Sequence, residues 1–448
     1  MTDGSTEKQQ PTAQPVPGYD DKTKAIVAPP QAPQARPDSE AGRKAGPEDH
    51  AEADTRPTVM LLGSGELSRE LAVAIRHLGA RVIAVDEHPH APAHGVADQS
   101  LTVAMTDTGE LSKVFGQLRP DYVVTATNAV AVEAIEALEG RAPDRHPSQL
   151  VPNARTVRLT ADREGLRRLA ADQLGLPTAP FWFAGSVGEL NAVGVHAGFP
   201  LLIKPVAGRG HSVVSRPDDI EPAWRRAVGG GSGAQRQRVM AETVVEVEFD
   251  VTLLVVRSDG PSGPLIEFCS PIGHRDADGV VLESWQPQQM SEVAVDAAKS
   301  IAARIVKALG GRGVFAVELM VNGDEVYFAD VTARPHPSAW VTLRSQRLSA
   351  FELQARAILG VPVDAMMVSP GAAHAIHGGR GAGTPHPAGL ARALGVPESD
   401  LRSFGRGFSP AGATNMLGVA LATAPDVAAA RDRARQVASA LNVRDSRG

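Results

Sequence analysis

Two short runs of apolar and β-branched residues near the middle of the chain predict a β-hairpin. The runs cover residues 314–321 and 325–331, and the Asn322-Gly323 pair between them is a strong signal for a tight turn. Glu318 and Asp330 interrupt the apolar pattern. A buried carboxylate is costly unless it is paired or binds a metal, and Mg²⁺ binds one or two carboxylates together with substrate phosphates. The hairpin therefore indicates a magnesium site, and the alternative is a pair of structural salt bridges.

The pattern upstream predicts a strand–turn–helix–strand unit with parallel strands. Residues 59–62 read as a strand, 63–65 as a Gly-rich turn, 66–78 as an amphipathic helix and 81–85 as a second strand. Such a unit binds ligands at the carboxyl ends of its strands. Asp86 leaves dinucleotide binding open, but the turn lacks the third glycine of that fingerprint. The pattern continues with helices at 108–118 and 129–138 and a strand at 121–124.

A second unit carries a phosphate-binding pattern. The apolar strand 201–204 ends on Lys204, and the following turn contains Gly208 and Gly210. Backbone amides of such a turn can cradle phosphates while the ammonium neutralises them. The alternative is an edge lysine with a solvated head. Segment 239–245 reads as a strand that carries Glu242, whose carboxylate could bind ribose hydroxyls, while the backbone of Val245 could contact a base.

The remaining periodic segments predict further elements in the second half of the chain. Helical spacing occurs at residues 164–174, 292–309, 350–359 and 424–441, and strand patterns occur at 212–214, 246–257, 265–271 and 417–422.

Composition bounds the possible classes of protein. The 448 residues suggest about two to four domains. The net charge of −6, without any Lys/Arg-rich run, argues against a nucleic-acid partner. The single cysteine, Cys269, excludes an intrachain disulfide framework and a multi-cysteine metal site. No apolar stretch reaches the length of a transmembrane helix and no signal peptide is evident. We therefore expect a soluble cytoplasmic protein with no membrane partner.

Residues 1–56 differ in composition from the rest of the chain. They are dense in Pro, Ala, Gln and charged residues, with few aromatic or branched side chains to offset the entropy of ordering. They predict a disordered leader, with a partner-binding polyproline arm as the alternative.

Short motifs along the chain, taken in order, resemble a known family. They are Gly-Ser-Gly-Glu-Leu (63–67), Asp-Arg-Glu-Gly-Leu-Arg-Arg-Leu-Ala (162–170), Lys-Pro-Val (204–206), Glu242, Gly-His-Arg (273–275), Glu-Ser-Trp-Gln-Pro-Gln-Gln-Met (283–290), Glu318, Asp330 and Arg-Pro-His (334–336). From about residue 58 onward the chain resembles the ATP-grasp superfamily, and more narrowly the formate-dependent phosphoribosylglycinamide formyltransferases.

This resemblance implies an α/β fold class in four segments. They are the leader (1–56), an N-terminal Rossmann-like pre-ATP-grasp domain (57–160), an ATP-grasp domain (161–365) and a small C-terminal module (366–448). It also implies ATP and Mg²⁺ as cofactors, a small carboxylate and an amine as substrates, and a homodimer.

The resemblance also assigns roles to individual residues. Lys204 and Arg334 would act in catalysis, and Glu318 and Asp330 would hold Mg²⁺. The acceptor site would include Glu66 and Leu67. ATP would be bound by Arg163, Lys204, Gly208, Gly210, Glu242, Val245 and Asp250.

The chain departs from the family pattern in the acceptor site. Asn128 stands where the family has a glutamate, and Pro337 where it has an aspartate. Asn415-Met416 replace a pair of arginines, and Arg406 keeps one cation of the phosphate clamp. Charged hydrogen bonds of such a clamp contribute on the order of kcal/mol to the free energy of substrate binding. We therefore expect a conserved ATP half and an altered acceptor.

Three functions follow from these observations. The main interpretation is an ATP- and Mg²⁺-dependent ligase that activates formate, or another small carboxylate, as an acyl phosphate and transfers it to an amine other than the usual glycinamide ribotide. The first alternative is the ordinary formate-dependent phosphoribosylglycinamide formyltransferase of purine synthesis. The second is a non-catalytic or NAD-binding protein that has kept the fold.

Overall fold

The computed structural model describes residues 55–140, 148–208, 210–231, 237–260, 262–277, 280–378, 387–404 and 415–441. Almost all of the predicted leader and the predicted clamp residue Arg406 lie outside these ranges. No helix in the described ranges is long and apolar enough to cross a membrane.

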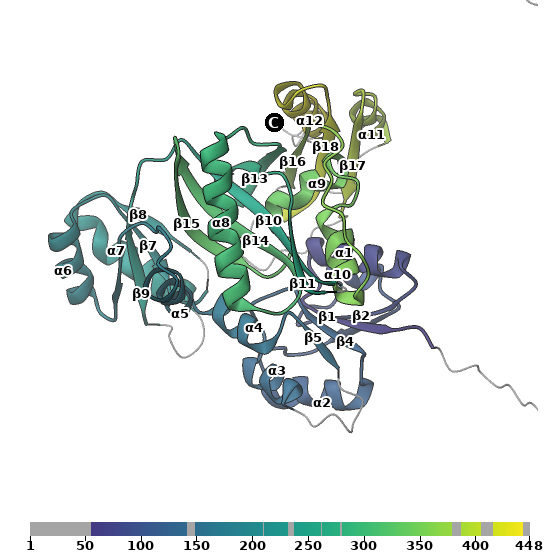
Figure 1. Cartoon of the computed structure of the whole chain (residues 1–448), viewed down its shortest axis with the longest axis horizontal. Coiled ribbons are helices and arrows are strands. Elements are labelled where there is room, and N and C mark those ends of the chain that lie inside the picture. Colours follow the sequence, from purple (N-terminus) through teal and green to yellow (C-terminus); the bar gives the residue numbers. More distant parts are fainter. Residues whose placement is uncertain are drawn as a thin grey trace, which may run out of the picture. The chain divides into compact units, whose positions relative to one another are not determined.

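The predicted N-terminal unit is a sheet of five parallel strands in the order β3-β2-β1-β4-β5. Helix α1 (Glu66–His77) packs on one face, and α2 (Thr108–Leu118) and α3 (Val132–Glu139) pack on the other (Figure 1). The remaining elements of this part are β1 (Thr58–Leu62), β2 (Arg81–Asp86), η1 (Pro92–Gly95), β3 (Gln99–Thr102), β4 (Tyr122–Thr125), β5 (Gln149–Val151) and α4 (Ala154–Ala161).

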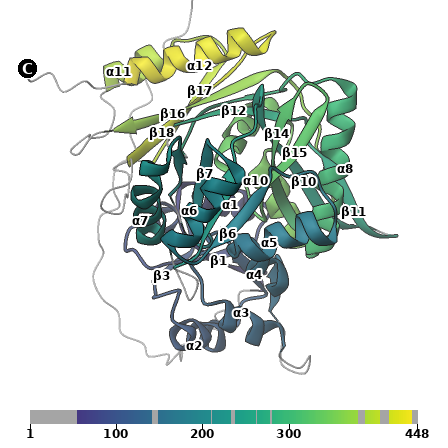
Figure 2. The same ribbon diagram turned by 90° about the vertical axis from the view of Figure 1, so that its left-hand side faces the viewer.

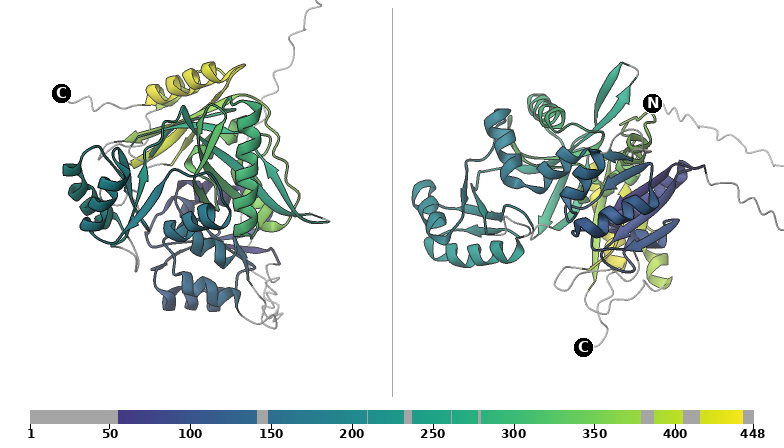
Figure 3. Two further views of the ribbon diagram at one scale, coloured as in Figure 1. Left: turned by 60° about the vertical axis from the view of Figure 1, so that its left-hand side comes forward. Right: turned by 90° about the horizontal axis from the view of Figure 1, so that it is seen from below.

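A second, smaller sheet is antiparallel and carries the phosphate-binding pattern. Its order is β6-β9-β7-β8, and one helical layer of α6 (Val187–Ala197) and α7 (Ile220–Gly230) covers it (Figure 3). Its strands are β6 (Phe181–Ala184), β7 (Leu201–Pro205), β8 (Ser212–Val214) and β9 (Val239–Thr243), with a short turn η3 (Pro217–Asp219) before α7.

The helix predicted at residues 164–174 is divided in two. Helix α5 (Arg163–Arg168) continues as a π-helical turn, η2 (Leu169–Gln173). The Leu174 N–H donates to the Leu169 carbonyl, 3.0 Å away, which is the five-residue spacing of a π turn.

The central sheet has nine strands in the described residues, and all its pairs are antiparallel. The main path is β15-β14-β10-β12-β13-β16-β18-β17, and β11 pairs with β10. Helix α8 (Glu292–Leu309) packs on one face of β10 and β14, and α10 (Ala350–Leu359) on the other. The strands are β10 (Phe249–Gly260), β11 (Gly263–Phe268), β12 (Ile272–Ala277), β13 (Val280–Gln286), β14 (Gly313–Asn322), β15 (Glu325–Thr332), β16 (Gly371–Gly378), β17 (Ser399–Ser403) and β18 (Asn415–Thr423).

The hairpin prediction is confirmed. β14 and β15 pair antiparallel around a turn in which Gly323 has a φ of 58°, a conformation that favours glycine. Asn322 pairs with Glu325, and Glu318 pairs with Asp330 across a bulge. The two carboxylates therefore project from the same stretch of the sheet.

The C-terminal module does not form a sheet of its own. β16 pairs with β13, so the module continues the central sheet, and α12 (Val427–Leu441) packs on β16 and β18 (Figure 2). The sequence analysis missed β16 because its small residues, GAAHAIHG, show no alternation. The connecting elements are η4 (Pro337–Val341), α9 (Thr342–Ser345) and α11 (Pro387–Leu394).

Candidate active site

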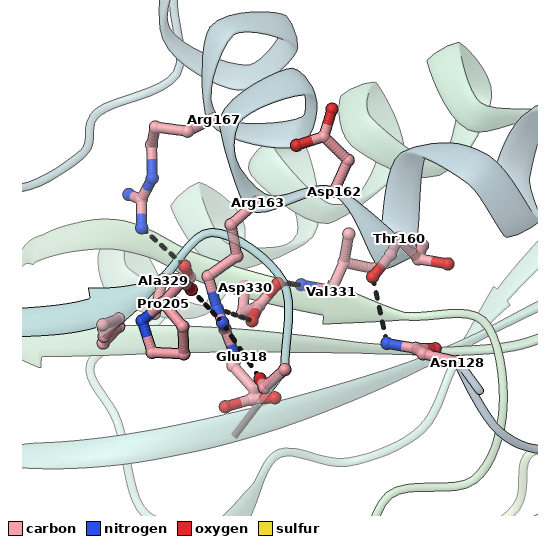
Figure 4. A network of polar contacts seen from close by, with 12 residues as sticks. Asn128, Thr160, Asp162, Arg163, Arg167, Pro205, Glu318, Ala329, Asp330 and Val331 are labelled. Carbon is pink, nitrogen blue, oxygen red and sulfur yellow. Dashed lines mark hydrogen bonds and ion pairs between the residues drawn. The ribbon is translucent and has the colours of Figure 1, made fainter. Parts of the chain in front are cut away.

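The centre of the candidate site is the carboxylate pair of the hairpin. Glu318 on β14 lies directly opposite Asp330 on β15, and both project toward Arg163 (Figure 4). Burial and the Asp330 charge raise the pKa of Glu318 to about 7. The Glu318 side chain keeps 30% of its surface exposed, so water moderates this repulsion.

Such a pair fits a bound dication, which relieves the repulsion between the two carboxylates. No group of three or more His, Cys, Asp or Glu able to hold a metal occurs among the described residues. This donor set suits Mg²⁺, which takes few protein ligands and completes its coordination with substrate phosphates and water.

Arg163 connects the carboxylate pair to the small sheet. Its Nε lies 3.9 Å from Asp330 Oδ2, and its Nη1 donates to the carbonyl of Pro205 at 2.6 Å and to that of Gly208 at 3.3 Å. The guanidinium therefore bridges β15 and the Gly-rich loop that follows β7. This position is compatible with the predicted contact to ATP.

Lys204 and Glu242 form an ion pair at the ends of β7 and β9. Lys204 Nζ lies 2.7 Å from Glu242 Oε2, and Arg167 Nη2 donates to Glu242 Oε1. Burial alone would raise the pKa of Glu242, but the charges of Lys204 and Arg167 outweigh it and hold the pKa below its usual range. Arg167 belongs to the 162–170 motif, but no role was predicted for it from the sequence.

The ion pair bears on the predicted role of Glu242. The Glu242 side chain is only 5% exposed and both of its oxygens are engaged by cations, so it orients Lys204. Its contact with ATP stays a prediction. Val245 and Asp250 follow β9 and open β10, and their contacts with ATP stay predictions as well.

The Gly-rich loop approaches the C-terminal end of α7 very closely. Gly208 and Gly210 both have a φ of 104°. A Cβ on Gly208 would lie 2.2 Å from the carbonyl oxygen of Gly230, so only glycine fits there.

We predict that Gly208→Ala raises the KM for ATP by roughly 5- to 100-fold, the equivalent of about 1–3 kcal/mol of backbone strain. Steady-state kinetics with varied ATP checks this. Gly79→Ala is the matched control, because Gly79 also has a positive φ, 83°, but its added Cβ meets nothing within 4 Å. Equal KM values in the two variants would remove the loop from the ATP site.

A second polar group adjoins the carboxylate pair. His336 Nε2 lies 3.6 Å from Glu318 Oε1, and His336 Nδ1 accepts the Ser338 N–H at 3.2 Å. Burial, with the nearby His274 and Arg334 charges, lowers the pKa of His336 to about 3, so the ring is neutral. The Ser338 hydroxyl also donates to Thr252 Oγ1 at 2.9 Å. The contact of His336 with Glu318 was not predicted from the sequence.

The residues predicted for the acceptor are only partly brought together. Arg334 Nη1 donates to Asn128 Oδ1 at 2.7 Å. The Asn128 amide donates to the Thr160 carbonyl at 3.2 Å (Figure 4). Asn128 therefore links the N-terminal sheet to the Arg-Pro-His segment. Glu66 and Leu67 open α1, and Pro337 opens η4 directly after His336.

Arg402, which is a further arginine beside β18, is already paired. Its Nε lies 3.5 Å from Glu70 Oε2, and its Nη1 lies 2.6 Å from Asp400 Oδ2. Glu70 lies on α1, in the same helix as the predicted acceptor residues.

The motif at residues 284–290 has a structural role. The indole N–H of Trp285 donates to Gln288 Oε1 at 2.7 Å, and the Gln286 amide donates to the Ser270 carbonyl at 2.6 Å. Trp285 pairs with Gly273, where an added Cβ would lie 2.4 Å from the indole nitrogen. These contacts explain why glycine precedes His274.

The structure does not support dinucleotide binding at the N-terminal turn. Asp86 accepts the Ser64 N–H at 2.7 Å and the His88 N–H at 3.1 Å, so both carboxylate oxygens are used within the chain.

Comparison with protein families agrees with the fold and the site. A ribonucleotide synthetase preATP-grasp domain matches residues 57–160, an ATP-grasp domain matches 169–351, and the PurT C-terminal domain matches 371–441. The facing sheets with Lys204, Glu318 and Asp330, together with these matches, define an ATP-grasp enzyme. The third interpretation, a non-catalytic or NAD-binding protein, is therefore not supported.

This chain matches its relatives over almost their full length. Formate-dependent phosphoribosylglycinamide formyltransferases from Corynebacterium glutamicum and Paraburkholderia xenovorans are 47% and 44% identical to it, over 86% and 87% of this chain and 94% and 96% of their own. The chain belongs to the formate-dependent phosphoribosylglycinamide formyltransferase family. A solved structure from Mycobacterium tuberculosis, described as glycinamide-RNase-transformylase T, is 63% identical over 86% of this chain and all of its own, with a TM-score of 0.72.

More distant structures share the fold alone. A carboxyaminoimidazole ribonucleotide synthase from Aspergillus clavatus, solved with ATP, is 22% identical with a TM-score of 0.74. Together the comparisons favour the first alternative, the ordinary formyltransferase, over the main interpretation of an unusual acceptor.

Proposed function

We propose that this enzyme uses ATP and Mg²⁺ to convert formate into formyl phosphate and transfers the formyl group to the amine of glycinamide ribotide. The observation that carries the proposal is the match of the chain to formyltransferase relatives over 94% or more of their length, including the C-terminal domain. Asn128 and Pro337, which differ from the family pattern, favoured an acceptor other than the ribotide. The experiment below decides between the two acceptors.

In the proposed mechanism the two sheets hold the triphosphate between them. The amides of Gly208 and Gly210 would contact phosphates, and Lys204, oriented by Glu242, would neutralise phosphate charge. Asp250 would bind ribose and Val245 would offer its backbone to the base. Phosphoryl transfer depends mainly on such positioning and charge neutralisation.

Glu318 and Asp330 would hold Mg²⁺, which supplies charge neutralisation at the phosphates when bound. Arg163 beside Asp330 adds positive charge at the same point. Arg334 and His336 would lie beside the small acid, while Glu66, Leu67, Asn128, Pro337 and Arg406 would line the acceptor site.

The proposal predicts a kcat/KM for glycinamide ribotide of about 10⁴ M⁻¹s⁻¹ or above, within the range of enzymes acting on their own substrates. The measurement is transfer of label from isotopic formate to the ribotide, with ADP release followed in parallel. A panel of unphosphorylated amines serves as the comparison. A better rate with one of those amines, together with a poor rate for the ribotide, would return the function to the unusual-acceptor interpretation.

The homodimer, the cytoplasmic location and the segment boundaries at residues 57, 161 and 366 stay predictions. Light scattering, cell fractionation and limited proteolysis are their respective tests.

A further inference from the structure

One face of the central sheet carries a line of charged side chains that extends beyond the carboxylate pair. Thr252 on β10 pairs with Glu318 on β14 and, on its other side, with Ile272 on β12. Residues two apart on a strand share a face. This register places Asp330, Glu318, Asp250, His274 and Asp276 on the same face, in that order across four strands.

His274 has one ring nitrogen with a partner and one without. Its Nδ1 lies 3.0 Å from Asp276 Oδ1, and because a carboxylate accepts, Nδ1 carries a proton. Its Nε2 is buried and has no hydrogen-bond partner among the described residues, and the side chain as a whole is only 7% exposed. A buried polar atom without a partner is uncommon in a folded protein, and a bound ligand, ion or water at Nε2 would satisfy it.

His274 lies beside the carboxylate pair of the candidate site. Its ring centroid lies 5.9 Å from that of His336, which in turn contacts Glu318. Burial would raise the pKa of Asp276, but the hydrogen bond and charge of His274 outweigh it and lower the pKa. His274 and Asp276 therefore adjoin the Glu318 carboxylate through His336.

The charges around His274 favour its protonated form. Burial acts to lower the pKa of His274, but the hydrogen bond and charge of Asp276, with the charges of Glu318 and Asp250, outweigh it and raise the pKa. A protonated ring that donates from Nδ1 to Asp276 offers Nε2–H as a second donor, directed at an anion.

We propose that His274 is a further catalytic residue of the acid-activating step: its Nε2–H donates to an oxygen of the small carboxylate, or of the acyl phosphate formed from it, and Asp276 is the positioning residue that orients the ring. The inference rests on the proposed function. In this step a carboxylate oxygen forms a bond to the γ-phosphorus while the bond from that phosphorus to the bridging oxygen breaks, and the electron pair leaves with ADP. His274 keeps its proton throughout.

The test uses the full chain with ATP, Mg²⁺ and formate, and it traps the acyl phosphate with hydroxylamine. This readout does not need the ribotide, so it separates the inference from the identity of the acceptor. His274→Ala is expected to lower kcat/KM for formate by about 10- to 100-fold, the effect of losing a charged hydrogen bond, while the KM for ATP changes less than about threefold. His274→Gln, whose amide nitrogen can still donate, is expected to recover most of that loss, and Asp276→Asn to fall between the two.

His374→Gln on β16 is the matched control, since His374 also has a buried ring nitrogen without a partner in the described residues but lies beside Glu283 and Arg275. The inference would be overturned if kcat/KM for formate in His274→Ala stayed within about threefold of the wild-type value. It would also be overturned if the Ala and Gln variants lost kcat/KM for formate and kcat/KM for ATP equally. Wild-type trapping without formylation of the ribotide would reject the proposed acceptor and leave the inference standing. Loss of acyl phosphate trapping in His374→Gln would count against the inference, because the loss in His274→Ala could then be explained by a folding defect.

Discussion

Glu318→Gln and Asp330→Asn are each expected to lower kcat at least about 100-fold, because each removes a charge that holds the metal against the phosphates. Both substitutions keep the side-chain volume, and in Asp330→Asn the amide oxygen could still accept the Val331 N–H that Asp330 Oδ1 now accepts at 2.8 Å. Formate-dependent ADP release at saturating ATP is the measurement. Glu325→Gln is the matched control, since Glu325 lies on the same hairpin with its carboxylate bonded to the exposed Tyr327 hydroxyl.

Titration with Mg²⁺ gives a second test of the metal role of Glu318. The pKa of about 7 for Glu318 means that, without metal, its carboxyl group takes up a proton as the pH falls through 7. Metal binding must then displace the proton, so the concentration of Mg²⁺ required for half-maximal activity should rise below pH 7. Activity at the wild-type level in either variant would exclude these residues from a metal role.

Arg431→Met is expected to destabilise the fold by about 2–3 kcal/mol, because it leaves a buried carboxylate with one partner fewer. Glu283 on β13 is fully buried, with Arg431 Nη2 at 2.8 Å and Arg435 Nε at 3.0 Å, and the Arg431 guanidinium lies 3.9 Å from the centre of the Trp285 ring. These contacts hold α12 on the central sheet. Chemical denaturation gives the free energy of unfolding.

The matched control for this prediction is Arg225→Met, which removes an exposed pair with Glu221 and should cost less than about 0.5 kcal/mol. Burial would raise the pKa of Glu283, but Arg431 and Arg435 hold it below its usual range. Its contribution to stability is therefore present above the pKa of the unfolded chain and is lost as pH falls through the lower folded value. The deficit of Arg431→Met should shrink in acid. A deficit that is independent of pH would show that packing on Trp285, rather than charge, is what the arginine provides.

Much of the fold was predictable because local patterns agree with the tertiary structure. The helices predicted at 292–309 and 350–359 have the observed bounds, each begins at a serine cap, and each ends at a glycine. The hairpin was predictable because Asn322-Gly323 fits a tight turn, and the apolar, β-branched run 314–321 placed Glu318 on a strand. The strands β12, β13 and β16 were missed, since their residues show no regular alternation, and β13 and β16 pair across a long stretch of chain.

By itself, the sequence determined which residue types could do chemistry: the carboxylates of the hairpin, the lysine before a Gly-rich turn and the family to which the motifs belong. Only the tertiary structure decided how these groups are engaged. It showed that Glu242 is held between Lys204 and Arg167, and that His274 is fixed by Asp276 with its other nitrogen free of partners in the described chain. The physical reason is that burial and the pairing of charges depend on strand register and on the approach of separate sheets, and neither is encoded in the spacing of residues along one segment.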